Sequence, residues 1–319
     1  MPVGGQGKNV SIFQQIEATE GVKPTGNYRR LPVKSFTLAP NENLAQDVVL
    51  SSAATTRDPL DPYRDFIDIT GEAVVPLDLT NIGHWLRMLL GSPTTTGTTN
   101  LTHVFRSGSN ALPSVAIEKV YSDIAGANEG YLGVRANTLS VPIQQSGVAD
   151  ATFGLMALAH TPNLTSAPGT PTTATFERFN RFQGSVSRNG AALPAFMQGT
   201  LTFSNGMEAV KAIRNDRRIE GIDWAETSAQ FEGTVRLTAA NAAILTDAIA
   251  GTPCSLAYQL QINAQRSLTL ELPRVTLAPI GPRLEGPMGI DLPVRGLASF
   301  DSTAACMFRV TLLNQTAAY

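Results

Sequence analysis

An internal repeat near the middle of the chain constrains its fold more than any other sequence feature. Residues 72–93 read EAVVPLDLTNIGHWLRMLLGSP, and residues 232–253 read EGTVRLTAANAAILTDAIAGTP. Aligned without a gap, the two segments share six identities in 22 positions, more than chance gives for common residue types. The repeat predicts that the chain contains two copies of one structural unit. Such a duplicated unit often supplies two quasi-equivalent subunits to a symmetric ring.

The repeat and its flanks divide the 319 residues into four predicted parts. These parts are an N-terminal arm (1–30), a first copy (31–160), a linker (161–175) and a second copy (176–319). The linker is assigned because its Thr, Pro and Gly residues carry no charge. The arm has little periodicity, and we expect Ile12, Phe13 and Ile16 to anchor it to a neighbouring chain.

Each copy reads as a strand, a long loop, a second strand, a helix and a hairpin. Apolar and polar residues alternate over residues 31–39 and again over 196–204, which predicts half-buried strands. Residues 47–65 contain two prolines and are predicted as a long loop, with residues 210–223 as its shorter counterpart. Long loops of this kind usually serve function or bind a partner.

A helix follows the second strand in both copies. Apolar residues recur at helical spacing after residue 81, and Gly91 and Pro93 end the pattern. The predicted buried positions of the two helices are Trp85, Leu89, Leu245 and Ile249. One helix among many strands, without β–α–β alternation, predicts a mainly β fold: an antiparallel sandwich or barrel with a flanking helix in each copy.

Composition narrows the function classes. Charged residues make up 16 % of the chain, against about a quarter in an average soluble protein, which fits extensive burial in an assembly as well as a low-charge β-protein. The net charge is −2, so an electrostatic grip on nucleic acid is disfavoured. Cys254 and Cys306 lack metal or redox spacing and are expected to be buried thiols. The chain shows no signal peptide and no apolar run long enough to span a membrane.

A search for catalytic chemistry gives no motif. His84, His103 and His160 have no metal-ligand spacing, and no nucleophile elbow, P-loop or dinucleotide fingerprint is present. The carboxylate pairs around residues 58–68 more plausibly cap turns or meet arginines than form a glycosidase pair. We therefore expect no enzyme activity, no cofactor and no metal.

Several segments, taken in order, resemble the tail tube (major tail) proteins of long-tailed bacteriophages, in the subgroup of roughly 300 residues. The resembling segments are QIEATEGVKP (15–24), LPVKSFTL (31–38), RDPLDPY (57–63), ITGEAVVPLDLTNIGHWLRMLLGSPTTTG (69–97), THVF (102–105) and LPSVAIEK (112–119). The match covers much of residues 12–160, and the second copy resembles the family more weakly. The combination and order of the segments carry the resemblance.

The resemblance implies two tandem tail-tube β-sandwich or barrel domains, each with one flanking helix. It further implies a threefold ring with a pseudo-sixfold inner barrel, stacked rings, and a channel through which DNA passes without specific binding. A tape measure protein and a tail terminator would be partners, in a virion tail assembled in the host cytoplasm. The expected contacts between rings are Arg57, Asp58, Asp61, Arg64, Arg214, Arg217 and Arg218. Deleting residues 51–64 is expected to block stacking and leave the domain folded.

Two other readings stay open at the level of sequence. One is a different virion structural protein, such as a capsid decoration protein. The other is an all-β carbohydrate-binding or carbohydrate-active module, which needs a cleft with aromatic platforms. Trp85 and Trp224 both lie in apolar patterns, which favours burial in the core over a role as sugar platforms.

Overall fold

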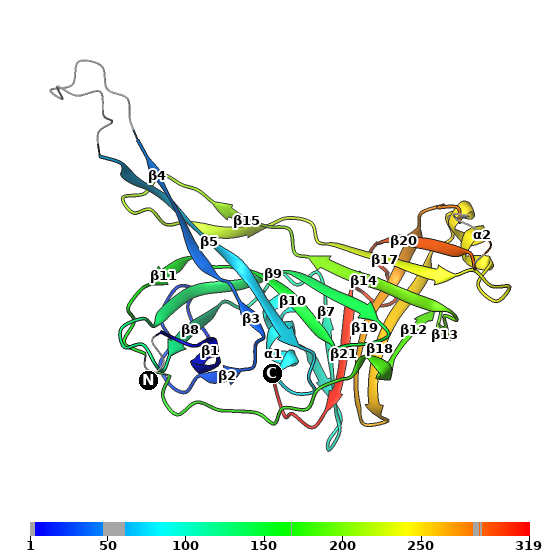
Figure 1. The fold of residues 1–319 in the computed structure, drawn as a ribbon, viewed down its shortest axis with the longest axis horizontal. Coiled ribbons are helices and arrows are strands. Elements are labelled where there is room, and N and C mark those ends of the chain that lie inside the picture. The colour runs from blue at the N-terminus through cyan, green and yellow to red at the C-terminus, as the bar shows by residue number, and fades with distance from the viewer. Residues whose placement is uncertain (1–3, 47–60, 167, 283–286, 288) are drawn as a thin grey trace, which may run out of the picture.

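The chain folds into a long, strongly twisted β structure. The computed structural model describes residues 4–46, 61–166, 168–282, 287 and 289–319. Strands hold 51 % of the described residues and helices 8 %, so the prediction of a mainly β fold is confirmed. The β4–β5 hairpin projects from one end of the molecule, and α2 lies at the opposite end (Figure 1).

The elements follow one another in the same general order in both halves of the chain. Those of the first half are η1 (Gly7–Asn9), β1 (Val10–Ile16), β2 (Arg29–Leu31), β3 (Ser35–Phe36), β4 (Ala39–Ala45), β5 (Tyr63–Pro76), α1 (Ile82–Leu90), β6 (Thr94–Thr96), β7 (Leu101–Arg106), β8 (Val115–Tyr121), β9 (Glu129–Gln144), β10 (Asp150–Met156) and β11 (Ala159–Thr161). Those of the second half are η2 (Arg181–Gln183), β12 (Gly184–Arg188), β13 (Ala191–Ala192), β14 (Phe196–Ser204), β15 (Met207–Val210), β16 (Gly221–Trp224), β17 (Ser228–Arg236), α2 (Ala243–Ala250), β18 (Cys254–Asn263), β19 (Arg266–Leu277), β20 (Asp291–Ala298) and β21 (Arg309–Asn314).

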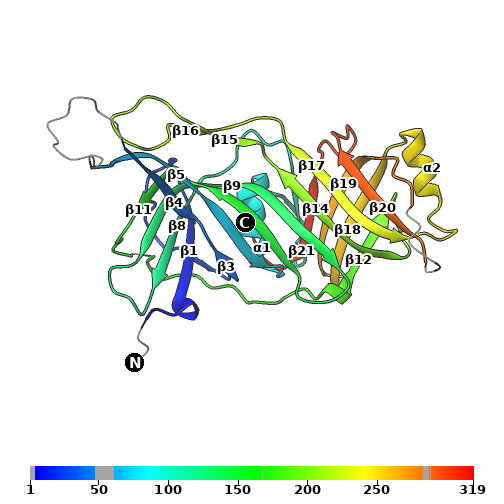
Figure 2. The same cartoon turned by 45° about the horizontal axis from the view of Figure 1, so that its top comes forward.

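One antiparallel sheet runs through both halves without a break (Figure 2). Its strand order is β4, β5, β10, β9, β14, β17, β20 and β19. The first four strands come from the first half and the last four from the second half. The two groups have corresponding orders. In the first half β4 is followed across the sheet by β5, β10 and β9, and in the second half β14 is followed by β17, β20 and β19.

A second layer of strands also has the same arrangement in each half. Strand β1 pairs with β8 and follows η1, while β12 pairs with β18 and follows η2. The long strands β9 and β19 bridge the layers, because one end of each pairs in this second layer and the other end pairs in the main sheet. The first residue of β8, Val115, lies opposite Val134 on β9, and the first residue of β18, Cys254, lies opposite Val275 on β19. Val134 and Val275 therefore occupy corresponding positions in the two halves.

The N-terminal region differs from the sequence-based expectation. Residues 10–31 are not an arm, since β1 pairs with both β2 and β8. Ile12 and Phe13 are buried inside the chain and Ile16 is partly buried, so their apolar groups already have partners within the chain. The sequence VSIFQQI shows no clear alternation and did not predict a strand. The burial of this strand depends on pairing with β8, about 100 residues away.

Helix α1 forms where predicted and packs inside the molecule. Trp85 and Leu89 are buried as expected, and the Trp85 ring lies 5.5 Å from that of Phe153 on β10. The Asp78 carboxylate begins the helix by accepting hydrogen bonds from the backbone N–H groups of Asn81 (2.8 Å) and Ile82 (2.9 Å). Burial raises the pKa of Asp78, and the hydrogen bonds from Asn81 oppose that rise.

Helix α2 forms where predicted but buries a different face. Ile249 was expected in the core, yet its side chain is 70 % exposed, and Leu245 is only partly buried. The buried positions are Ile244 and Ala248. The helix lies at the outer end of the molecule, where it contacts β19 (Figure 1).

The first predicted strand and loop also need correction. Residues 31–39 do not form one strand, because β2 ends at Leu31 and β3 covers only Ser35–Phe36. Within the predicted loop 47–65, residues 47–60 lie outside the described structure, but Tyr63–Asp65 already belong to β5 and pair across a hairpin with β4. The counterpart loop 210–223 begins in β15 and ends in β16.

We predict that Asp78→Ala destabilises the protein by about 1–2 kcal/mol, because first-turn N–H groups of α1 lose their acceptor in a buried site. Chemical denaturation followed by circular dichroism measures the change. Glu208→Ala, on an exposed position of β15, is the control and should change stability little. Equal stability of the two variants would show that Asp78 does not hold the helix start.

Candidate assembly interface

The main sheet contains a seam where the two halves of the chain meet. At this seam β14, from the second half, lies beside β9, from the first half. Strand β14 pairs antiparallel with β9 over seven residue pairs, from Gln198 opposite Gln144 to Ser204 opposite Thr138. Leu201 and Phe203 on β14 are buried, as are Val141 and Leu139, which lie opposite them. Strand pairing and shared core burial therefore join the two halves.

A second seam joins the halves behind the sheet. Strand β21, from the second half, pairs with β7, from the first half. The chain then ends with Tyr319 against α1: its ring lies 5.0 Å from that of His84 and 4.8 Å from that of His103. Gly83 is required there, because an added Cβ would lie 2.2 Å from the Tyr319 ring. Burial, followed by the charges of Arg29 and Arg87, lowers the pKa of His84 to about 3, so this contact involves a neutral imidazole at ordinary pH.

Asn205 fastens the main seam from the end of β14. Its buried side-chain amide donates to the backbone oxygens of Leu89 (2.8 Å) and Ala136 (3.1 Å). Its backbone N–H donates to the backbone oxygen of Asn137 at 2.8 Å. One residue of the second half thus satisfies groups on α1 and β9 of the first half.

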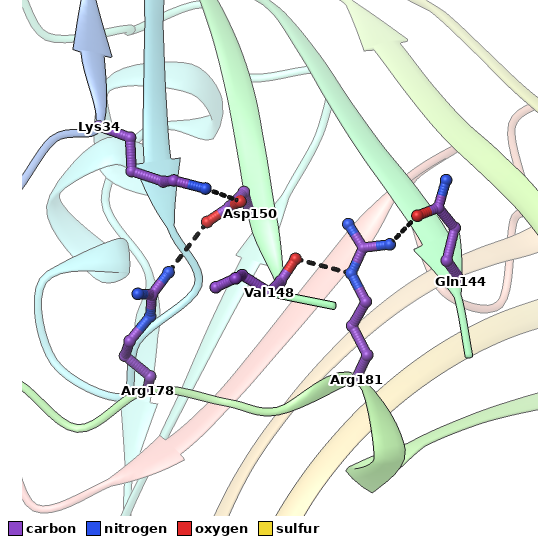
Figure 3. A network of polar contacts seen from close by, with 6 residues as sticks. All are labelled: Lys34, Gln144, Val148, Asp150, Arg178 and Arg181. Carbon is purple, nitrogen blue, oxygen red and sulfur yellow. Dashed lines mark hydrogen bonds and ion pairs between the residues drawn. The ribbon is translucent and has the colours of Figure 1, made fainter. Parts of the chain in front are cut away.

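A polar network holds the chain where it enters the second half (Figure 3). Asp150, at the start of β10, accepts hydrogen bonds from Lys34 (2.5 Å) and Arg178 (3.1 Å). Arg181 in η2 donates to the backbone oxygen of Val148 at 2.6 Å and to the side chain of Gln144. These contacts tie the segment before β12 to the ends of β9 and β10.

The predicted loop 210–223 contacts the strands on either side of the predicted loop 47–65. The Ile67 N–H on β5 donates to the Arg217 backbone oxygen at 3.0 Å, and the Arg217 side chain pairs with Glu42 on β4. Lys211 lies over the ring of Phe66, 4.7 Å from its centroid. The β15–β16 hairpin therefore packs against the base of the β4–β5 hairpin.

An apolar cluster lies beneath the β15–β16 hairpin. Its buried members are Leu112, Met207, Ile219 and Ile222, and Phe66, Met156, Leu158 and Ala209 pack against it. Arg135 on β9 stacks on the Trp224 ring, 4.8 Å from its centroid, and pairs with Glu20 at 2.9 Å. The hairpin of the second half is thus docked on the first half by both apolar and charged contacts.

The residues predicted to contact another ring fall into three groups. Arg57 and Asp58 lie outside the described residues. Arg64 and Arg217 converge on Glu42, and Asp61 is exposed just before β5. Their role in contacts between rings stays a prediction.

The other two predicted residues lie in the loop between β15 and β16. Arg214 pairs with Asp216 at 3.0 Å and with Glu220. The side-chain hydrogen bond to Asp216 is the main reason that the pKa of Arg214 is raised, and the same contact lowers the pKa of Asp216. Arg218 is exposed, and its backbone N–H donates to Asp216.

Sequence reasoning did not identify Asn205, Arg135 or Glu42 as interface residues. The sequence gives one local signal for the first, an Asn-Gly pair at the end of an alternating stretch, which is typical of a tight turn. Arg135 and Glu42 find partners far along the chain, and no local pattern marks such pairs.

Both ends of the main sheet leave strand edges open. Within the described part of the chain, β3 and β4 pair only with β5. At the other end, β20 pairs with β17 along its length but with β19 only over residues 296–298. Exposed strand edges present unpaired N–H and C=O groups to any strand that can approach.

The face of the main sheet turned away from α1 is polar and carries few basic residues. Side chains on this face alternate with buried ones along each strand. Representative members are Thr70, Glu72, Thr138, Ser140, Thr152, Gln198, Thr200, Thr202, Gln230, Glu232, Thr234 and Arg295. Arg295 pairs with Glu232 at 2.8 Å, so the one basic residue in this set is matched.

The described residues contain no group of three or more His, Cys, Asp or Glu side chains arranged to hold a metal ion. None of the helices over the same residues has the length and apolarity to cross a membrane. Cys254 and Cys306 are buried free thiols, as expected.

A mainly β chain with open strand edges, a docked hairpin and a polar sheet face has the features of a subunit that adds to further subunits. Comparison with known families agrees: the family described as phage tail tube protein matches residues 7–303. The chain therefore belongs to the phage tail tube protein family and is a structural protein of the virion tail. No curated protein matches it.

We predict that Asn205→Ala lowers the free energy of unfolding by about 1–3 kcal/mol, because two buried carbonyl groups at the seam lose their donor. Urea denaturation of the purified chain gives the value. Asn215→Ala, on the exposed loop between β15 and β16, serves as the control. If Asn205→Ala behaves like this control, the side-chain amide does not fasten the seam.

Proposed function

We propose that the chain forms closed rings by extending its own main sheet from one subunit to the next. The supporting observation is the β9–β14 seam, where the last strand of one half receives the first strand of the other. The same strand order in both halves leaves one open edge at each end of the chain. Placing the β3–β4 edge of one chain beside the β19–β20 end of another would repeat the seam between chains.

The number of chains follows from the duplication that we infer. If each half is one copy of the tube unit, three chains supply six units. The ring then has true threefold symmetry and a pseudo-sixfold inner barrel. Because α1 and α2 bury different faces, the two kinds of unit are not equivalent in such a ring.

The polar sheet face supports a channel for DNA. In a closed barrel with α1 outside, this face lines the lumen. Hydroxyl, amide and acidic side chains hold phosphate groups weakly or repel them, whereas a basic lining would retain them. DNA is thus expected to pass without specific binding, and no catalytic role is assigned to the chain.

Other components of the tail complete the proposal. Stacked rings form the tube, a tape measure protein is an expected partner, and a terminator ends the growth of the tube. Assembly takes place in the host cytoplasm. The contacts between rings are assigned to the end of the β4–β5 hairpin and to the charged loop between β15 and β16.

Electron microscopy and mass measurement of the purified chain test the proposed ring. We expect rings or tubes whose mass per ring equals three chains. Dispersed monomers over a wide range of salt and protein concentration would contradict the proposal, and rings of six chains would contradict the duplicated unit.

A deletion tests the contacts between rings. Replacing residues 47–60 by a short Gly-Ser turn keeps the paired part of β4 and β5 and should leave the fold and the single ring intact. We expect such rings to stack at least tenfold less than the unmodified chain, measured as tube length in micrographs. Unchanged tube lengths would show that this segment does not join the rings.

A further inference from the structure

Two large apolar side chains are exposed at opposite ends of the molecule. Leu44 on β4 is 66 % exposed, and Leu297 on β20 is 63 % exposed. Strand β4 belongs to the projecting hairpin at one end, while β20 lies toward the other end, near α2 (Figure 1). The two side chains cannot meet within one chain. Leu297 lies on the mostly polar face of the main sheet.

The strand registers identify the counterpart of Leu44 in the other half. Glu72 on β5 aligns with Glu232 in the repeat, so Arg64 and Trp224, each eight residues earlier, also correspond. Arg64 pairs across its hairpin with Leu44, and Trp224 pairs across its hairpin with Met207. Leu44 is therefore the counterpart of Met207.

The same method identifies the counterpart of Leu297. Thr70 and Gln230, each two residues before the aligned glutamates, correspond in the repeat. Thr70 pairs with Met156 on β10, and Gln230 pairs with Leu297 on β20. Leu297 therefore corresponds to Met156.

The two counterparts meet inside the chain. Met207 and Met156 share the apolar cluster beneath the β15–β16 hairpin, and Met207 is only 7 % exposed. Both also contact the side-chain amide of Asn137, which reaches the Met207 backbone oxygen and the Met156 sulfur. Met207 and Met156 thus lie in one cluster within the chain, whereas their counterparts Leu44 and Leu297 lie far apart and are exposed.

We propose that Leu44 of one chain packs on Leu297 of the next chain in the same ring, so that the β4–β5 hairpin docks on a neighbour as the β15–β16 hairpin docks on the first half of its own chain. The partner is a second copy of this chain. This inference rests on the proposed ring and adds a contact that strand pairing alone does not require. It assigns the base of the β4–β5 hairpin to contacts within a ring rather than to contacts between rings.

The inference explains why both leucines are tolerated on the surface of one chain. Burying a leucine side chain contributes about 1.5–3 kcal/mol of favourable free energy. The two exposed leucines do not make this contribution in the single chain, but they would make it in the proposed contact between chains. The cation–π contact of Arg135 with Trp224 has no equivalent, because the corresponding residues are Thr276 and Arg64. The contact between chains should therefore be weaker than the one within the chain.

Thiol cross-linking tests the contact in assembled rings. The variant Leu44→Cys with Leu297→Cys is assembled and oxidised to form disulfides, and the unmodified chain reports on the native Cys254 and Cys306, which are buried. We expect covalent dimers and trimers on a denaturing gel. A mixture of the two single variants should give dimers at most, and the unmodified chain should give monomers.

The internal counterpart provides the matched control. Met156→Cys with Met207→Cys should cross-link within one chain and give no multimers. If rings form and this control reacts but the Leu44–Leu297 pair gives no multimers, the proposed contact is wrong and the ring stands. If the unmodified chain forms no rings, the proposed function fails and this inference fails with it.

Substitutions at Leu44 give a second measurement. Leu44→Asp should reduce the fraction of chain in rings at least tenfold, while the melting temperature of the isolated chain stays within a few degrees. Leu44→Met, which introduces the residue of the internal counterpart, should retain assembly. Normal assembly of Leu44→Asp would overturn the inference.

Discussion

The pairing of β14 with β9 is the interaction on which the rest of the structure depends. It lets two four-stranded groups share one sheet and places the second half of the chain against the first. Without that pairing, the edge of β9 would be exposed and Asn205 would lose its partners on α1 and β9. Every exposed edge of an antiparallel sheet presents the same unpaired N–H and C=O groups. The β9–β14 pairing covers one such edge inside the chain, but an edge remains open at each end of the main sheet.

The burial of the two helices also depends on which segments lie beside them. Helix α1 is buried because it packs against β9 and β7, and Tyr319 of the second half covers it at Gly83 and His84. Helix α2 occupies the matching place in sequence but at the outer end, and Ile249 remains exposed there. The difference between the helices comes less from their own sequences than from what lies next to them.

Local features were therefore predictable and long-range ones were not. The position of α1 follows from its apolar spacing, from Gly91 and from the carboxylate of Asp78, all within one short segment. The β1 strand and the burial of Ile249 were predicted wrongly, because each depends on whether a distant segment provides a partner. Arg217 was predicted as a contact between rings, which stays a prediction. Its pairing with Glu42 could not be predicted, because it brings together segments without any shared pattern.

The inequality of the halves has a physical consequence for assembly. The hairpin contact inside the chain has Met207 buried, Asn137 bridging and Arg135 stacked on Trp224, whereas the corresponding surface between chains offers two leucines and open strand edges. The stronger contact forms by folding, at any concentration of chain, and the weaker one depends on concentration. We therefore expect the chain to fold completely before it associates and, in the proposed ring, to add as a finished pair of units.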